Sequence, residues 1–500
     1  MQAFNATMRG SARAPSHRGA SRVGHTPMCP LQLRPVQSRA QASAVAVEAV
    51  ALEDKFLARN FAQFADVKAD PSLAGVRAAS WAALPSMRMP TTRNEEYRFT
   101  DITPIVKSTL VPADASVAVS REEVSKWVPK DSAQSYVVIV NGVLRPELGD
   151  VSGVQGGIYV GPLSGAPKEV AAHVGKLSAE RGGPFAMLSA AAARECVVLA
   201  LPKAATLATP LYILTLTSGG PGASTSTSAP RLLVHAGAGS SASLVEEHAP
   251  LAALTGSAAQ GGSYLTLAVA ELFLEQDAQV SHGYVEREAA GSFHTKATLV
   301  DQAESSSYSL TEARVGGALS RHDVGVAQRG PRTSTDMRHF LLAGEGQTHD
   351  LHTKLVLEHP EGKAQQLHKC IAAASSARGV FDGNVQVRRL AQRTDAGQLS
   401  RNLLLAPRAT VNVKPNLQII ADDVKCTHGC AVSDLSDEEM FYFRARGINA
   451  IAARQALVAS FGAEVTNRLP AAEVKARVSA DISAALANVN FAALTAEADS

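Results

Sequence analysis

The residues best suited to chemistry in this chain lie in one short run near its C-terminal end, Cys426-Thr427-His428-Gly429-Cys430. In an extended strand, residues at i, i+2 and i+4 point to the same side, so Cys426, His428 and Cys430 would share one face. Thiolate sulfur and imidazole nitrogen are ligands that iron and zinc accept. Cysteine is also among the most buried residue types, so this face could instead be core. The spacing leaves both interpretations open.

The segments around this run, and several that precede it, follow a recognisable order. Residues 414–429 read KPNLQIIADDVKCTHG and residues 437–448 read DEEMFYFRARGI. Earlier segments are RNEEYRFTD at 93–101, VNGV at 140–143, PFAML at 184–188, RGVFDG at 378–383 and QLSRNLLL at 398–405. Together they resemble the SufD proteins, scaffold subunits of the SUF iron–sulfur cluster assembly system, over roughly residues 50–465. Ser189 stands where that family usually has Asn, and the markers of the paralogous SufB proteins, ECDS and HEATTS, are absent.

The resemblance implies a scaffold and not an enzyme. It implies a heterodimer with a SufB-like paralogue, association with a SufC-like ABC ATPase, and delivery of clusters to apo iron–sulfur proteins. A transient iron–sulfur cluster or iron would be held where the two paralogues meet, with a Cys-x-His element on this side. Cys426 and His428 fall on that element. Cys430 stands where the family usually has a small residue, so it would be an extra thiol or a buried replacement.

From about Cys196 to Val432 short alternating runs recur every ~10–12 residues, which is typical of many short strands. They include residues 211–216, 231–235, 243–247, 264–270, 279–285, 295–300, 307–312 and 320–326. The spacing is compatible with a sandwich or barrel and with a solenoid. Small-residue corners such as Gly237-Ala238-Gly239-Ser240 favour stacked coils. The resemblance implies a mainly β fold with a right-handed parallel β-helix (β-solenoid) core.

The chain is predicted to have four parts. These are a disordered transit peptide (1–45), an N-terminal helical and mixed domain (46–195), the β-helix core (196–433) and a C-terminal helical domain (434–500). Phe56, Leu57, Phe61 and Phe64 have roughly helical spacing. A strand at 136–140 leads into Asn141-Gly142, the best hairpin signal in the chain, and a helix is expected at about 184–193.

Residues typical of helix ends follow the last predicted strand. Ser436 and Glu439 form a capping box and Gly447 suits the C′ position, so a helix is predicted over 437–446. Asn449 can cap a second helix, and a third is expected over about 471–487. Aromatic side chains are favoured anchors of protein interfaces. The predicted ATPase-binding residues are Phe441, Tyr442, Phe443 and Phe461.

The leader is basic. Residues 1–47 contain six Arg and no acidic residue, as organelle transit peptides do, although a merely disordered tail would look similar. Composition leaves plastid and mitochondrion open, and the resemblance favours the plastid stroma of the chloroplast. Without these residues the chain has 42 basic and 46 acidic residues, a balance with no electrostatic case for nucleic acid. No segment reaches the ~18 uncharged apolar residues of a membrane span.

The cysteines are too few for a disulfide framework: Cys29 lies in the leader, and Cys196, Cys370, Cys426 and Cys430 remain. The chain has no Cys-x-x-Cys pair, no G-x-x-x-x-G-K-[ST] loop and therefore no ATP site of that type, and neither H-E-x-x-H nor G-x-S-x-G.

Two further interpretations stay open. Five histidines lie close together in the sequence: His339, His349, His352, His359 and His368. They would form one metal- or proton-handling surface, or they would be separate strand residues on different faces. One alternative function is that of a β-solenoid carbohydrate-active enzyme, which needs clustered acidic residues. Asp422-Asp423 is the only pair of adjacent acidic residues late in the strand region. The other alternative is a purely structural interaction subunit without a metal role.

Overall fold

The fold is that of a computed structural model, which describes residues 54–257, 261–433, 435, 437–487 and 489. Contacts divide the chain into residues 1–49 and residues 50–500. The expected transit peptide, 1–45, lies outside the described residues. Everything below concerns the second unit, and the domain boundaries proposed within it stay a prediction.

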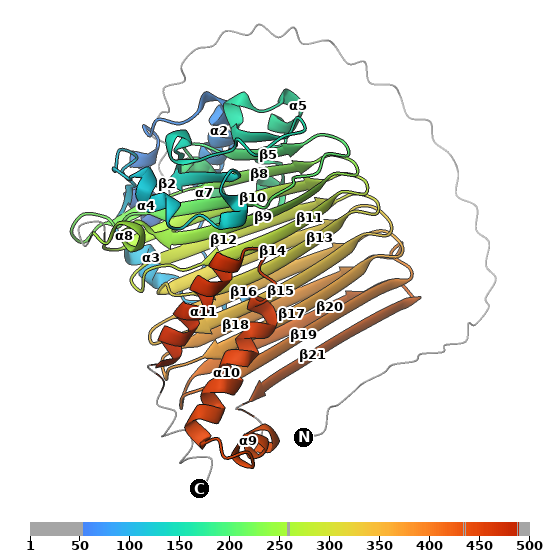
Figure 1. Cartoon of the computed structure of the whole chain (residues 1–500). Coiled ribbons are helices and arrows are strands. Elements are labelled where there is room, and N and C mark those ends of the chain that lie inside the picture. Colours follow the sequence, from blue (N-terminus) through green and yellow to red (C-terminus); the bar gives the residue numbers. More distant parts are fainter. Residues whose placement is uncertain (1–53, 258–260, 434, 436, 488, 490–500) are drawn as a thin grey trace, which may run out of the picture. The chain divides into compact units, whose positions relative to one another are not determined.

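Most of this unit is a parallel β-solenoid of two sheets, which confirms the predicted fold class and rules out the sandwich (Figure 1). Each coil gives one strand to each sheet, and each strand pairs in parallel with the strand two places along the chain. About seven such coils lie between Leu211 and Ser433. The first sheet contains β8 (Arg231–Ala236), β10 (Tyr264–Leu274), β12 (Phe293–Gln302), β14 (Leu319–Gln328), β16 (Thr348–Leu357), β18 (Arg378–Val387) and β20 (Thr410–Ile419). The second contains β6 (Leu211–Thr217), β9 (Ser241–Pro250), β11 (Gln279–Glu286), β13 (Ser307–Val315), β15 (Ser334–Ala343), β17 (Lys363–Ala372), β19 (Thr394–Leu404) and β21 (Val424–Ser433).

Apolar side chains stack inside the solenoid because each strand alternates its side chains between the two faces. Along the first sheet one inward column is aliphatic over seven consecutive strands, from β5 (Val197–Leu201) to β18: Leu199, Val234, Leu272, Val300, Val326, Leu355 and Val385. Burying each such side chain contributes roughly 1.5–3 kcal/mol. The repeat of this column holds the coils in register.

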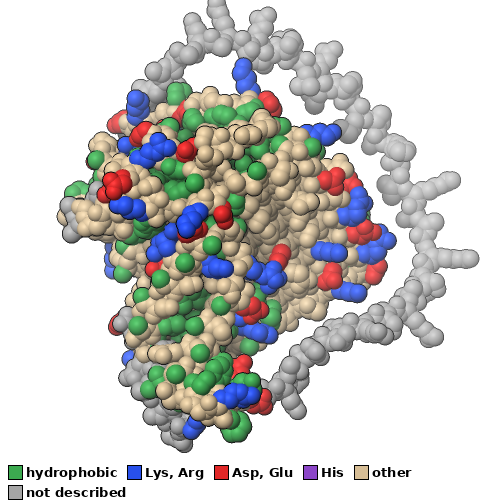
Figure 2. Space-filling view, in the orientation of Figure 1, with side chains coloured by type: hydrophobic (Ala, Val, Ile, Leu, Met, Phe, Trp, Pro, Cys, Tyr) green, Lys and Arg blue, Asp and Glu red, His purple; other side chains and the backbone are tan. Residues whose placement is uncertain are grey.

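One corner of each coil before the last has a left-handed backbone residue. At this corner a strand of the first sheet turns into a strand of the second, and the residue's N–H donates to a carbonyl of the next coil. Seven corners share the geometry: Ala204, Gly239, Asp277, Ser305, Arg332, Glu361 and Arg393. Side chains at the corner also pair between coils, as Arg332 does with Glu304 and Arg393 with Glu361. Figure 2 shows acidic and basic side chains gathered along this edge, at the right of the view.

The two ends of the solenoid differ. At the N-terminal end the first sheet finishes with β4 (Tyr159–Pro162), which is antiparallel to β5, and the second finishes with the hairpin of β2 (Tyr136–Val140) and β3 (Val143–Leu144). The predicted Asn141-Gly142 turn is confirmed, with φ of 52° and 78°. At the C-terminal end the outermost strands are β20 and β21, and no strand of the described residues pairs with their outer edges.

Helices precede and partly cover the sheets. α7 (Gly183–Ala192) packs on β10, and its Phe185 and Leu188 join Phe56, Phe61 and Phe64 in one buried cluster. The other elements of this region are α1 (Lys55–Asn60), α2 (Ala74–Ala83), α3 (Thr103–Lys107), α4 (Arg121–Ser125), α5 (Lys168–Ala171), α6 (Lys176–Arg181), α8 (Leu251–Thr255), β1 (Leu110–Pro112) and β7 (Thr225–Ser228).

Three helices follow the last strand, as predicted (Figure 1): α9 (Asp437–Arg444), α10 (Ala450–Thr466) and α11 (Ala472–Ala487). α10 packs on β13, β15 and β17, and α11 packs on β13, so both lie on the outer face of the second sheet. Asn449 caps α10 by accepting from the N–H of Ala452 at 2.8 Å. Ser436 of the predicted capping box lies outside the described residues. Among the described helices none has the length and apolarity to cross a membrane.

Candidate functional site

The three predicted ligands lie on the outermost strand of the second sheet. Cys426, His428 and Cys430 of β21 are in register with Ala396, Gln398 and Ser400 of β19. Those three residues of β19 are buried and face the interior of the solenoid. These three side chains of β21 therefore face the interior too, but no further coil among the described residues covers them. Cys426 is half-buried, whereas His428 and Cys430 are exposed.

The surroundings of this site form the open end of the core. Cys426 packs against the interior aliphatic cluster, as do four partly buried residues of the last coil: Val411, Val413, Leu417 and Val424. Ile419, Ile420 and Val432 are exposed at the same end, with exposed fractions of 44%, 51% and 43%. Two thiols and an imidazole thus lie at the rim of an apolar surface beside two unpaired strand edges.

The site offers ligands but not a closed chelate within one chain. Alternate residues on a strand are spaced about 6.6 Å apart. Among the described residues, the one group of three His, Cys, Asp or Glu whose ligand atoms all lie within 4.8 Å is elsewhere. Partial burial raises the pKa of the Cys426 thiol and of the Cys430 thiol, so both are protonated at neutral pH. A metal ion must displace those protons, and ligands from outside the chain are needed to complete its coordination.

The histidines at 339–368 do not form one site. His339 and His368 are in register and buried inside the solenoid, where His339 Nδ1 lies 2.5 Å from Glu312 Oε2 and His368 Nδ1 lies 3.0 Å from Ser400 Oγ. His352 lies on the first sheet and pairs with Asp350 at 2.9 Å. The remaining two are His349, buried on the first sheet, and His359, in the corner after β16.

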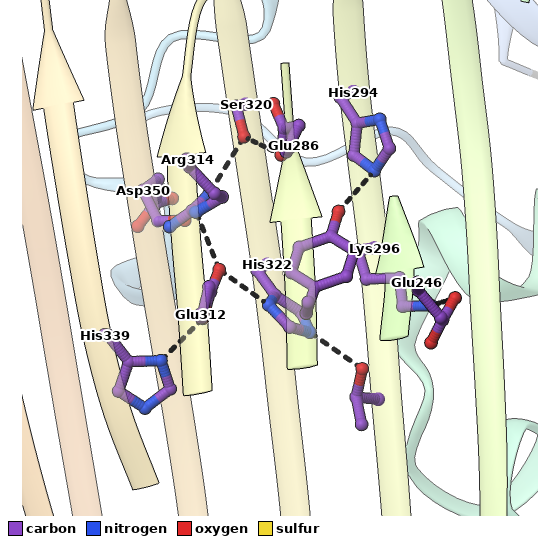
Figure 3. A network of polar contacts seen from close by, with 12 residues as sticks. Glu246, Glu286, His294, Lys296, Glu312, Arg314, Ser320, His322, His339 and Asp350 are labelled. Carbon is purple, nitrogen blue, oxygen red and sulfur yellow. Dashed lines mark hydrogen bonds and ion pairs between the residues drawn. The ribbon is translucent and has the colours of Figure 1, made fainter. Parts of the chain in front are cut away.

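Sequence reasoning missed a polar network inside the solenoid (Figure 3). Lys296 Nζ lies 2.6 Å from Glu246 Oε2, and Glu312 pairs with Arg314 at 2.8 Å and with His322 at 3.0 Å, with all of these side chains buried. The available signal was the alternation itself. Charged and imidazole side chains occupy inward positions of the predicted strands, where a purely apolar core would carry aliphatic residues.

The four aromatic residues predicted to bind an ATPase have different surroundings. Phe441 and Tyr442 on α9 are 73% and 55% exposed. Phe443 is half-buried. Phe461 packs against the cluster between α10 and the second sheet, and Lys369 Nζ lies 4.2 Å from the centre of its ring. In this chain Phe441 and Tyr442 are therefore the available anchors. Figure 2 shows hydrophobic side chains gathered over the α9 region at the lower end of the view.

Comparison with known proteins finds similarity to one protein family along most of the described chain. Residues 217–461 match the SUF system FeS cluster assembly, SufBD core domain, and residues 55–213 match the SufBD protein N-terminal region. Protein ABCI7, chloroplastic, of Arabidopsis thaliana is 39% identical over 80% of this chain and 83% of its own length. An iron–sulfur cluster assembly SufBD family protein of Synechocystis is 32% identical over 82% and 90%. Iron–sulfur cluster assembly protein SufD of Escherichia coli is 27% identical over 79% and 88%. The chain therefore belongs to the SufBD family, the non-enzymatic scaffold proteins of the SUF system of iron–sulfur cluster assembly.

Proposed function

We propose that this chain is the SufD-like half of a paired scaffold, and that an iron–sulfur cluster is built where its open end meets a SufB-like paralogue. The observation that carries the proposal is the place of Cys426 and His428. Soft ligands lie on the uncovered last coil, in an incomplete set, beside unpaired strand edges. Family membership excludes the carbohydrate-active alternative.

A partner with the same fold suits this end. An exposed strand edge is a template for pairing with another chain, and an exposed apolar surface marks an interaction site. A second solenoid with its own open end would continue both sheets and cover Val411, Val413 and Leu417. It would also supply the missing ligands. The cluster is cargo, to be passed to apo iron–sulfur proteins, and protonated thiols that bind only by losing a proton favour such release.

The ligand role is tested in the assembled complex. Cys426→Ser and His428→Ala, co-expressed with the SUF partners and reconstituted anaerobically, should each lower the cluster absorbance per complex at least several-fold. Both side chains are small and partly exposed, so complex assembly should be unchanged on size-exclusion chromatography. Cys430→Ala is the matched control from the same strand face, and it should retain most of the cluster. Wild-type cluster yield in both variants would overturn the proposal and leave a purely structural subunit.

A SufC-like ATPase is the proposed partner of α9. The chain has no G-x-x-x-x-G-K-[ST] loop, so nucleotide hydrolysis must come from another subunit. Phe441→Ala with Tyr442→Ala should abolish ATPase pull-down while circular dichroism stays that of the wild type. Ile451→Ala, on an exposed residue of α10, is the control. Retained pull-down by the double variant would refute this contact.

The proposed compartment is the chloroplast stroma. The support is the acid-free leader of residues 1–47 and the similarity to the Arabidopsis relative, which is named as a chloroplastic protein. Residues 1–60 fused to a fluorescent reporter should direct it into plastids. A cytosolic or mitochondrial signal from the same fusion would contradict the assignment.

A further inference from the structure

A second group of potential metal ligands lies deep inside the solenoid, far along the sheets from the last coil. His248 of β9, His294 of β12 and Glu288, two residues after β11, are buried, with their ligand atoms all within 4.8 Å of one another. A tetrahedral ion at about 2.1 Å from each ligand holds them about 3.4 Å apart, so movements of about an ångström would close the group around an ion.

The hydrogen bonds at this group leave one ligand free and orient the other two. No described residue lies within hydrogen-bond geometry of either ring nitrogen of His248, although the side chain is only 1% exposed. Its Nε2 lies 3.5 Å from Glu246 Oε2, longer than an ordinary hydrogen bond. A buried polar side chain without a partner costs about 1–3 kcal/mol, which a bound ion would remove.

Glu288 and His294 are held as metal ligands usually are. The Tyr264 hydroxyl donates to Glu288 Oε2 at 2.6 Å, and the Tyr284 hydroxyl lies 2.8 Å from His294 Nε2. His294 Nδ1 lies 2.7 Å from Glu288 Oε1, so a proton now bridges the two atoms that an ion would bind. Second hydrogen bonds of this kind fix the orientation of ligating groups.

The charge balance of the interior favours a cation. Four buried carboxylates lie in the interior of the solenoid, those of Glu246, Glu286, Glu288 and Glu312. Two cationic side chains, Lys296 and Arg314, are buried with them. Lys296 pairs with Glu246 and Arg314 with Glu312, which leaves Glu286 and Glu288. Glu286 is in register with His248, and its Oε1 has no hydrogen-bond partner. Uncompensated buried charge is costly, so two protons or one divalent ion must balance this pair.

We propose that His248, His294 and Glu288 form a buried site for a divalent first-row transition metal ion, separate from the cargo site on the last coil. Two imidazoles and one carboxylate are ligands that Fe²⁺, Co²⁺ and Zn²⁺ all accept. Its burial suits an ion acquired during folding and retained.

Cobalt is the probe, because its visible absorption reports the ligands. In the full chain, Cys426→Ser, His428→Ala and Cys430→Ser remove the ligands of the last coil, so that Co²⁺ bound at the cargo site does not contribute. After refolding with Co²⁺ and desalting, this protein should retain one ion per chain by elemental analysis, with visible bands and no sulfur charge-transfer band. Bound Co²⁺ should also raise the melting temperature.

Two variants of the site and one control decide the assignment. Glu288→Gln keeps an acceptor for Tyr264, and His248→Gln keeps a polar side chain, yet each should weaken Co²⁺ retention at least tenfold. His349→Gln is the matched control, because His349 is equally buried and its two ring nitrogens also have no hydrogen-bond partner. It should bind like the parent. No retained Co²⁺ after refolding, or equal retention in all three variants, would overturn the site and leave protons as the balancing charge.

Discussion

Gly462 in the middle of α10 should resist the substitution that ordinarily strengthens a helix. Alanine is about 1 kcal/mol more favourable than glycine in a helix interior. A Cβ at Gly462 would, however, lie 2.9 Å from ring carbons Cε2 and Cζ of Phe340, a fully buried residue of β15. Overpacking of this kind costs about 1–3 kcal/mol. Gly462→Ala is therefore expected to weaken the docking of α10 by up to about 2 kcal/mol.

The assay must be local, because a chain with a solenoid and separately packed helices need not unfold in one step. Amide hydrogen exchange of α10, read by mass spectrometry, reports local opening. A loss of up to about 2 kcal/mol in the docking free energy of α10 makes amide exchange in Gly462→Ala up to about thirty-fold faster. In a Phe340→Leu background the clash is removed, and the same change should slow exchange by about fivefold, because the helix-propensity gain of about 1 kcal/mol then acts alone. Slower exchange in the wild-type background, or equal acceleration in both backgrounds, would refute the proposed contact.

Three further predictions concern buried and exposed titratable groups. Burial lowers the pKa of His322 to about 4 and of His349 to about 3, so between pH 6.5 and 4 the unfolded chain binds protons that the folded chain does not. Stability should then fall on acidification by about 1.4 kcal/mol per histidine per pH unit, and a melting temperature that is flat from pH 7 to 5 would contradict this. Asp350→Asn removes the carboxylate that accepts hydrogen bonds from Arg321 and Thr100, both at 2.6 Å. It should lower the free energy of unfolding by roughly 3–5 kcal/mol and make residues 95–100 accessible to proteolysis. Asp382→Asn, the control, should have neither effect. In alkylation followed by mass spectrometry, Cys430 should react first and Cys426 next among the cysteines of the described residues. Cys196 and Cys370, whose burial raises the thiol pKa to about 12, should react only after denaturation.

The parts of the fold that sequence predicted are those with a local signal. Asn141-Gly142 turns where its positive φ values require it, and Asn449 starts α10 because its side chain caps the first turn. The solenoid needed more than periodicity, since alternating strands fit a sandwich equally well. The resemblance to a known family resolved that choice, and the parallel register confirms it.

The rest depended on contacts between distant residues. Phe461 looks like any interface aromatic in the sequence, but it lies on the face of α10 that packs on the second sheet, where Lys369, 92 residues earlier, contacts its ring. The pairing of His248 with Glu288 and His294 joins three segments in successive coils. No spacing rule connects them, because the coil length varies and the register is set by the stacking.

The difference between the two ends of the solenoid limits how many copies can join. Strands with two open ends would add subunits head to tail without limit and form filaments. Here the N-terminal end finishes in the short antiparallel strands β3 and β4, and short edge strands are poor templates for pairing, so we expect growth at β20 and β21. Joining two open ends consumes both, and the assembly stops at a pair. In the proposed assembly, a second copy of this chain and a SufB-like paralogue compete for that one position, so the relative supply of the two subunits would set which pair forms.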